Sequence, residues 1–271
     1  MTKYLWMNAK HLLTNPYLIF WSILFIEFWV FMWAYVFGAY IPPIEEAVRL
    51  YMASAYGNLL MLSLSGAAIT IASTLLYGSK SIRYVTKYTR LSPARFLIEN
   101  FASALIVLLT ISSVMFLSVI GVFHAKFGFT ILPANAVGLV FSIFLGAVFI
   151  YALAFFLNSI VVVLKSPKSS SFIFFLPLIF AFTAYAALWV DFGNLAYVSP
   201  FNCIVSTCYY YLSGKAPPTG NLTSMAQNNR PLVDVNIALA SLLAWSIILM
   251  VLDTLLLRKM RGISIEEIRT A

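Results

Sequence analysis

Charged side chains are scarce in this sequence: they make up 10% of its 271 residues, whereas 62% of the residues are hydrophobic. About a quarter of the residues in an ordinary water-soluble domain are charged, because its surface has to be solvated. The shortage of charge therefore excludes a soluble globular protein. It suits a chain that crosses a bilayer, since a helix spans the hydrocarbon with about 20 consecutive apolar residues.

Histidine and cysteine are rarer still. His11 and His124 are the only histidines and lie far apart in the sequence, which excludes a histidine metal cluster and a His-Glu-x-x-His site. The only cysteines, Cys203 and Cys208, are five residues apart. In a helix this spacing separates the Cα atoms too far for an easy disulfide, so we expect buried thiols.

A phosphate-binding loop is also missing. No Gly-x-x-x-x-Gly-Lys-Ser/Thr sequence occurs, and Gly214-Lys215 lacks both the upstream glycine and the following hydroxyl residue. The chain therefore has no P-loop of its own for a nucleotide. We expect no catalytic residues, no metal site and no cofactor in this chain.

The sequence does contain a series of long apolar runs. We predict an all-α integral membrane protein in which residues 1–271 form a single transmembrane domain. The six predicted spans are residues 17–38, 51–77, 96–123, 135–164, 171–190 and 236–257. Small residues recur on the second span, around Gly57 and Gly66, and on the fourth, at Gly138 and Gly146, which is typical of faces for close helix packing.

Two apolar segments are too short to cross the membrane. Residues 1–15 have Trp6 and Leu12 on one helical face and Asn8 outside it, a pattern typical of a helix lying in the membrane interface. Residues 199–212 form an apolar run of about 14 residues between the fifth and sixth spans, shorter than a span requires. We predict that this run is a re-entrant or interface-lying segment on the outer side.

The positive charges indicate the orientation. With the N-terminus inside, 13 of the 17 lysine and arginine residues face the cytoplasm and four face outward. Short cytoplasmic loops carry such an excess of basic residues. We therefore expect a multi-pass protein of the plasma membrane with both termini cytoplasmic. Anionic lipid accounts for the net charge of +8, so nucleic acid is not an expected partner.

The densest basic stretch is residues 79–95, between the second and third spans. Its basic residues at three-and-four spacing are Lys80, Arg83, Lys87 and Arg90. A helix would place them on one face, and Tyr84 and Tyr88 add apolar surface for a partner. We predict a short helix along the inner membrane face, with Pro93 opening the next helix. The alternative is a loop that only sets topology and touches anionic lipid.

Acidic residues inside the predicted spans are candidates for function. Glu27 lies near the middle of the first span, where a carboxylate costs a few kcal/mol unless it is neutral, paired or facing water. It either lines a pathway or pairs with a polar group of a neighbouring helix. Asp253, near the inner end of the sixth span, can pair with Arg258 or reach the interface. Asn221 begins an N-glycosylation sequon on the predicted outer side.

Taken in order, these features resemble the membrane subunit, or permease, of an ATP-binding cassette transporter of the type-2 exporter family. The N-terminal segment resembles the family's interfacial elbow helix, and the six spans resemble its permease core. The other matching segments are residues 79–90 with Leu91-Ser92-Pro93, residues 165–168, and Ser199-Pro200-Phe201 with the run after it. They resemble the coupling helix, the second cytoplasmic loop and the re-entrant hairpin. The match covers nearly the whole chain and rests on order and spacing; a large outer domain is missing.

The resemblance implies a permease that forms a translocation pathway as a dimer with an identical or related chain. Separate ATPase subunits, which bind ATP and Mg²⁺, would dock on the coupling segment. The implied contact residues are Lys80, Arg83, Tyr84, Lys87, Tyr88 and Arg90. Two other interpretations compete: an ion-coupled secondary transporter with sites at Glu27 and Asp253, and a non-transporting assembly or sensor subunit. An ATPase that co-purifies with the chain favours the first interpretation.

Overall fold

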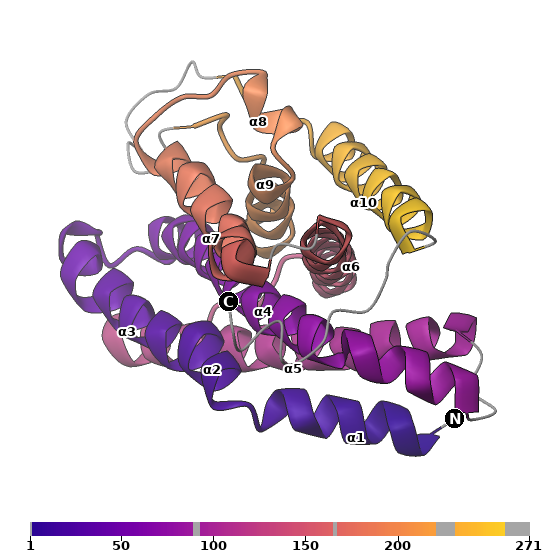
Figure 1. Cartoon of the computed structure of the whole chain (residues 1–271). Coiled ribbons are helices and arrows are strands. Elements are labelled where there is room, and N and C mark those ends of the chain that lie inside the picture. Colours follow the sequence, from indigo (N-terminus) through magenta and orange to yellow (C-terminus); the bar gives the residue numbers. More distant parts are fainter. Residues whose placement is uncertain (1, 89–92, 165–166, 221–230, 258–271) are drawn as a thin grey trace.

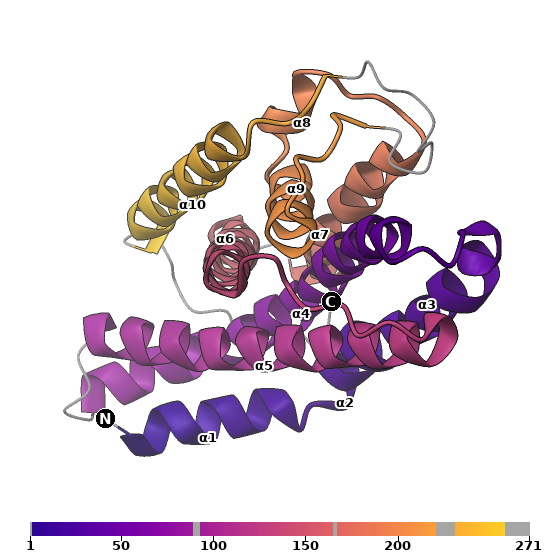
Figure 2. The same ribbon diagram turned by 180° about the vertical axis from the view of Figure 1, so that it is seen from behind.

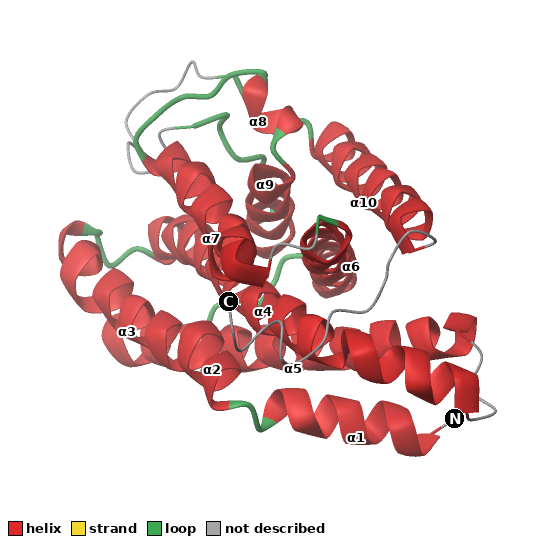
Figure 3. Ribbon diagram, viewed as in Figure 1, coloured by secondary structure: helices red, strands yellow, loops and turns green. Residues whose placement is uncertain are grey.

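The computed structural model of the chain describes the backbone of residues 2–88, 93–164, 167–220 and 231–257. Side chains are described for residues 3–78, 98–164, 168–220 and 231–256. Over these residues the regular structure is helical, with isolated β-bridges and no strand (Figure 3). The predicted all-α class is therefore confirmed.

Six helical segments are long and apolar enough to cross a membrane, which is the predicted number. They are Pro16–Tyr40, Glu45–Gly78, Ile98–Phe127, Ala136–Val163, Ser170–Leu188 and Val235–Leu256. The second begins at Glu45 rather than at residue 51, because the first helical turn accommodates acidic residues well. Arg49 also forms an ion pair of 2.9 Å with Glu45, one turn earlier.

The elements follow one another along the chain as labelled in Figure 1. The N-terminal helix is α1 (Thr2–Leu13), and the first span consists of α2 (Pro16–Ile19), η1 (Phe20–Leu24), α3 (Phe25–Phe31), η2 (Met32–Val36) and η3 (Phe37–Tyr40). The remaining elements are α4 (Glu45–Tyr88), α5 (Pro93–Phe127), α6 (Ala136–Val163), η4 (Pro167–Ser169), α7 (Ser170–Tyr185), η5 (Ala186–Leu188), α8 (Leu195–Val198), α9 (Pro200–Ser213) and α10 (Val235–Leu257).

Helix α4 is the central element, packed against α5, α6, α7 and α9 (Figures 1 and 2). Its small residues allow the close approaches that the sequence predicted. A Cβ atom on Gly57 would lie 2.9 Å from the carbonyl oxygen of Val205 in α9, and one on Gly66 would lie 2.8 Å from that of Trp21. Glycine is therefore needed at both positions for the backbones to meet.

The first span has an irregular backbone that α4 compensates. Residues of η1 and η2 adopt π-helical geometry, which leaves backbone carbonyls without their usual partners. Ser63 donates a hydrogen bond to the carbonyl oxygen of Ser22, and the Tyr51 hydroxyl donates one of 2.7 Å to that of Trp33. Backbone acceptors in the bilayer have no water, so these hydroxyls stabilise the span.

Helix α9 lies between α4, α6, α7 and α10, and most of its residues are buried. Ser199 caps its start, and Gly214, with a φ of +78°, ends it in the left-handed conformation that glycine adopts without strain. Cys203 and Cys208 are buried free thiols, as predicted. In α6, Gly138 packs on the Tyr211 ring, which confirms a predicted packing position.

The two ends of α9 contact different parts of the bundle. At its C-terminal end, the carbonyl oxygen of Tyr211 accepts a hydrogen bond of 2.9 Å from the N–H of Asn135, just before α6. At its N-terminal end, Trp245 donates a 2.9 Å bond from Nε1 to the carbonyl oxygen of Val198. Trp245 lies about 15 Å along α10 from Val235, at 1.5 Å per residue. The α8–α9 turn therefore packs against the first half of α10, and the Tyr197 hydroxyl of α8 accepts a 2.8 Å hydrogen bond from the N–H of Asp234, just before that helix.

The predicted coupling helix is corrected in one respect. Residues 79–88 are helical, but they continue α4 without interruption instead of forming a separate short helix. A lone glycine, Gly78, does not break a helix, and no proline lies between Gly78 and Pro93. Pro93 opens α5 as predicted. Within the predicted loop of residues 79–95, residues 79–88 and 93–95 are helical, and residues 89–92 lie outside the described chain.

Helix α1 packs along α5. Ala9 and Leu12 are buried, whereas Trp6 is 64% exposed and is free to contact lipid. Asn8, which lies outside the apolar face of α1, donates hydrogen bonds to Asn100 (2.9 Å to Oδ1) and to Ser103. Sequence reasoning did not predict these bonds, because the partners lie in α5, more than 90 residues away in the chain.

Candidate functional site

The predicted ATPase contact lies at the end of α4 that extends past the apolar span. The apolar run of α4 ends near Gly78, where the basic stretch begins at Ser79, and the helix continues to Tyr88, about 15 Å farther. Helix α5 likewise begins at Pro93, before the apolar run that starts at Phe96. The two helices thus form a hairpin that projects beyond the apolar segments.

The predicted contact residues fall on this hairpin. Lys80, Arg83, Tyr84, Lys87 and Tyr88 lie on the helical backbone of α4, and Arg90 lies outside the described residues. The side chains of residues 79–97 also lie outside the described part of the chain. The helical backbone provides the three-and-four spacing on which the prediction of a shared face depends.

Glu27, the predicted pathway candidate, has a hydrogen-bond partner. Ser118 of α5 donates a hydrogen bond to Glu27 Oε2 in α3, so the pair links the first and third spans. Such a partner is what the structural interpretation of Glu27 requires, because hydrogen bonding lowers the cost of a carboxylate in a membrane. A role of Glu27 in a pathway stays a prediction.

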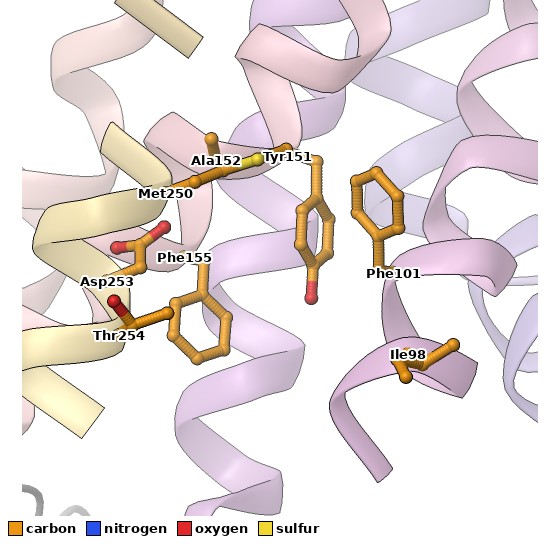
Figure 4. Close-up of a pocket in the computed structure, with 8 residues that line it drawn as sticks. All are labelled: Ile98, Phe101, Tyr151, Ala152, Phe155, Met250, Asp253 and Thr254. Carbon is orange, nitrogen blue, oxygen red and sulfur yellow. The ribbon is translucent and has the colours of Figure 1, made fainter. Parts of the chain in front are cut away.

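Asp253 lines a cavity of about 270 Å³ between α5, α6 and α10. The lining residues, labelled in Figure 4, are Ile98, Phe101, Tyr151, Ala152, Phe155, Met250, Asp253 and Thr254. The Tyr151 ring centroid lies 5.0 Å from that of Phe101 and 6.2 Å from that of Phe155. The cavity therefore has aromatic walls with one carboxylate.

Asp253 as a residue is 8% exposed. Its Oδ1 atom accepts no hydrogen bond from the described residues. The predicted alternative partner, Arg258, lies outside the described residues. A buried acceptor without a partner is costly and points to a ligand, an ion or a role in a reaction.

A second polar cluster lies nearby, where α1 covers α5. Glu99 is 1% exposed there, beside the hydrogen-bonded Asn8 and Asn100. Burial raises the pKa of Tyr4, and the negative charge of Glu99 raises it further. The cluster adjoins the cavity along α5, because Glu99 and Asn100 lie between the lining residues Ile98 and Phe101.

The structure does not bring Glu27 and Asp253 together. Along α5, Ser118 (the partner of Glu27) lies about 25 Å from Phe101 (which lines the Asp253 cavity), at 1.5 Å per residue. The two carboxylates therefore do not form one ion site within a chain. Among the described residues there is also no group of three or more histidine, cysteine, aspartate or glutamate side chains suited to a metal ion.

Sequence reasoning noticed Asp253 but not its cavity. The aromatic residues Phe101, Tyr151 and Phe155 belong to long apolar runs, and no local pattern distinguishes them from lipid-facing residues. The available signal was an acidic residue in a span, which indicates function by default. The predicted glycosylation site at Asn221 lies outside the described residues.

No protein-family model matches the chain, and a search of curated proteins finds no relative.

Proposed function

We propose that the chain is the membrane subunit of an ATP-driven exporter, with the ATP-hydrolysing subunits on separate chains. The observation that carries this proposal is the helical hairpin formed by the end of α4 and the start of α5, whose helical backbone carries the densest basic stretch of the sequence beyond the apolar run of α4. The excess of basic residues assigns the hairpin to the cytoplasm, where an ATPase would bind.

The continuity of α4 suits a mechanical role. A force on residues 79–88 acts on one uninterrupted helix that contacts α5, α6, α7 and α9. Closure of the ATPases on ATP would move this helix and shift the population between inward-facing and outward-facing states. The pathway would form between two such permeases, identical or related, in the plasma membrane. Both termini of each permease would lie in the cytoplasm.

The α8–α9 segment suits a re-entrant plug on the outer side. Its turn lies beside Trp245, while the end of α9 bonds the chain at Asn135, next to the start of α6. Lys215, just after α9, also forms an ion pair with Glu46 at the start of α4. These contacts support a segment that enters the outer half of the bundle and returns. There it would close the exit of a pathway until α4 moves.

The proposal is tested by the double variant Tyr84→Ala/Tyr88→Ala. Aromatic anchors in a partner's groove can contribute about 2 kcal/mol or more, whereas exposed ion pairs contribute about 0–1 kcal/mol. We expect the double variant to lose the co-purifying ATPase or to uncouple transport from ATP hydrolysis. Charge removal at Lys80 or Lys87 should weaken docking mildly and mainly at high salt. The measurements are co-purification and ATPase activity of the complex.

Tyr40→Ala is the matched control. Tyr40 is 93% exposed and lies at the end of the first span that is predicted to face outward, away from the α4–α5 hairpin. It should retain the ATPase. If Tyr84→Ala/Tyr88→Ala also keeps its ATPase bound and coupled to transport, the basic stretch only sets topology and the proposal is wrong.

An ion-coupled carrier is the second candidate, favoured by Asp253 in a span, whose Oδ1 has no hydrogen-bond partner among the described residues. Such a carrier would move its substrate in vesicles that hold an ion gradient and no ATP. The proposed exporter would not. A non-transporting assembly or sensor subunit would be inactive in both conditions while still binding its partner.

A further inference from the structure

We propose that the cavity between α5, α6 and α10 binds protonated organic amines with an apolar body, with Asp253 as their counter-ion. The inference is independent of an ATPase partner, because every lining residue belongs to this one chain. It concerns binding to the cavity and assigns no transport step to the ligand.

The charge of the cavity selects the ligand class. Among the described residues of the lining, Asp253 is the only one with a carboxyl group, and its Oδ1 lacks a hydrogen-bond donor among the described residues. A protonated amine supplies both a donor and a positive charge, and such charge-assisted bonds are shorter and stronger than neutral ones. A neutral alcohol supplies only the donor, and an anion supplies neither.

The walls of the cavity select the apolar body. The rings of Phe101, Tyr151 and Phe155 line the cavity and lie to one side of the Asp253 carboxylate (Figure 4). Aromatic faces attract cations, and the flexible thioether of Met250 adapts to the shape of a ligand. The volume of about 270 Å³ is close to the smallest ligand pockets, so a single ring with a short amine chain fits best.

The opening of the cavity lies at the surface of the bundle. Ile98 of α5 is 60% exposed, and Thr254 of α10 is also exposed. A ligand can therefore arrive from the membrane or its interface. None of the eight lining residues that the structure describes is basic, so this described part of the lining has no cation to pair with a phosphate. This favours a free amphiphilic amine over the ammonium headgroup of a phospholipid.

The test uses the full-length chain in neutral maltoside micelles, with calorimetric titration of 4-phenylbutylamine and of 4-phenylbutan-1-ol. The alcohol has the same ring and chain but no charge at neutral pH. We expect the amine to bind at least tenfold more tightly than the alcohol. Asp253→Asn should remove most of this difference. Glu45→Gln, which removes an exposed carboxylate on α4, should leave it unchanged.

A second variant keeps the test decisive if Asp253→Asn does not fold. Phe101→Leu retains apolar volume but removes a ring face, so it should weaken amine binding several-fold more than alcohol binding. Equal affinities for amine and alcohol in the unaltered chain would overturn the proposal, as would amine binding that survives Asp253→Asn. Amine binding that appears only in Arg258→Gln would also overturn it, because Asp253 would then be occupied by Arg258.

A competition experiment distinguishes the two sources of an ammonium group. Phosphatidylethanolamine is added to the micelles, with phosphatidylglycerol as the lipid lacking an amine. Displacement of 4-phenylbutylamine by phosphatidylethanolamine alone identifies the lipid headgroup as an occupant. If neither lipid displaces it, free amines are the ligand class, as the lack of a basic lining residue predicts.

Discussion

Two carboxylates inside the spans differ in what surrounds them. Glu27 accepts a hydrogen bond from Ser118, so part of its desolvation cost is offset by a neighbouring helix. Asp253 is buried with an Oδ1 that no described residue satisfies. Removal of each carboxylate should therefore have opposite effects on stability, because Glu27 accepts a hydrogen bond and Asp253 Oδ1 accepts none from the described residues.

Asp253→Asn should raise the melting temperature of the ligand-free protein. A buried acceptor left without a partner costs about 1–3 kcal/mol, and more for a charged group, so the neutral amide is less costly at this position. The measurement is thermal unfolding in detergent, with Glu45→Gln as the control for an exposed carboxylate. A lower melting temperature would mean that Asp253 has a stabilising partner.

Glu27 and Ser118 should behave as one unit in a double-mutant cycle. Residues that share a hydrogen bond show interaction energies of about 0.5–3 kcal/mol, so Glu27→Ala and Ser118→Ala together should cost less than their separate effects added. Unfolding of the two single variants and the double variant provides the comparison. Strict additivity would contradict the pairing. Altered substrate-stimulated ATP hydrolysis in Glu27→Gln, with assembly intact, would instead favour a pathway role.

At the scale of elements, α4 is fitted to its neighbours by small residues and hydroxyl groups. At Gly57 and Gly66 the backbones of α9 and of the first span approach α4 closely. The hydroxyl groups of Ser63 and Tyr51 donate hydrogen bonds to carbonyl oxygens in the π-helical turns of the first span. A helix that touches so many others transmits displacement well. It also tolerates little added volume.

Gly57→Ala should destabilise the protein, whereas Gly121→Ala should not. The added Cβ at Gly57 would lie 2.9 Å from a backbone oxygen of α9, but at Gly121 it would meet nothing within 4 Å. Overpacking costs about 1–3 kcal/mol, while alanine in an open helix position stabilises by up to about 1 kcal/mol relative to glycine. The yield of folded protein and its melting temperature check this. Equal effects would indicate that α4 and α9 separate easily.

At the scale of the whole molecule, the asymmetry of basic residues predicts the orientation of the bundle. The projecting α4–α5 hairpin then lies on the cytoplasmic side, and the chain after α9 lies outside. The native thiols Cys203 and Cys208 are buried, so they should contribute little to labelling by membrane-impermeant reagents. The labelling of single introduced cysteines can therefore be measured against a low background from the native thiols.

Cysteines at Ser79 and Ser166 should react only from the cytoplasmic side, and one at Lys215 only from outside. Lys215 is a better outer site than Thr219, because the Lys215 side chain is 57% exposed and Thr219 is 5% exposed. The measurement is labelling of right-side-out and inside-out vesicles. Reaction at position 215 from the cytoplasmic side would contradict the six-span topology.

The sequence by itself determined the six apolar segments, the helical class, the packing glycines and the buried thiols. These depend on the length and spacing of apolar runs within one segment, because a bilayer or a neighbouring helix acts on each run locally. The bounds agree to within a few residues except at Glu45, where the acidic first turn extends the helix beyond its apolar part.

Only the tertiary structure decided which polar groups meet. Asn8 bonds Asn100, and Ser118 bonds Glu27, although about 90 residues separate the partners in each pair. The inward side of α10 depends on how it packs against α6, and this packing places Asp253 in an aromatic cavity that no local pattern reveals. Contacts between distant segments arise from the geometry of packed helices, which the periodicity of a single segment does not contain.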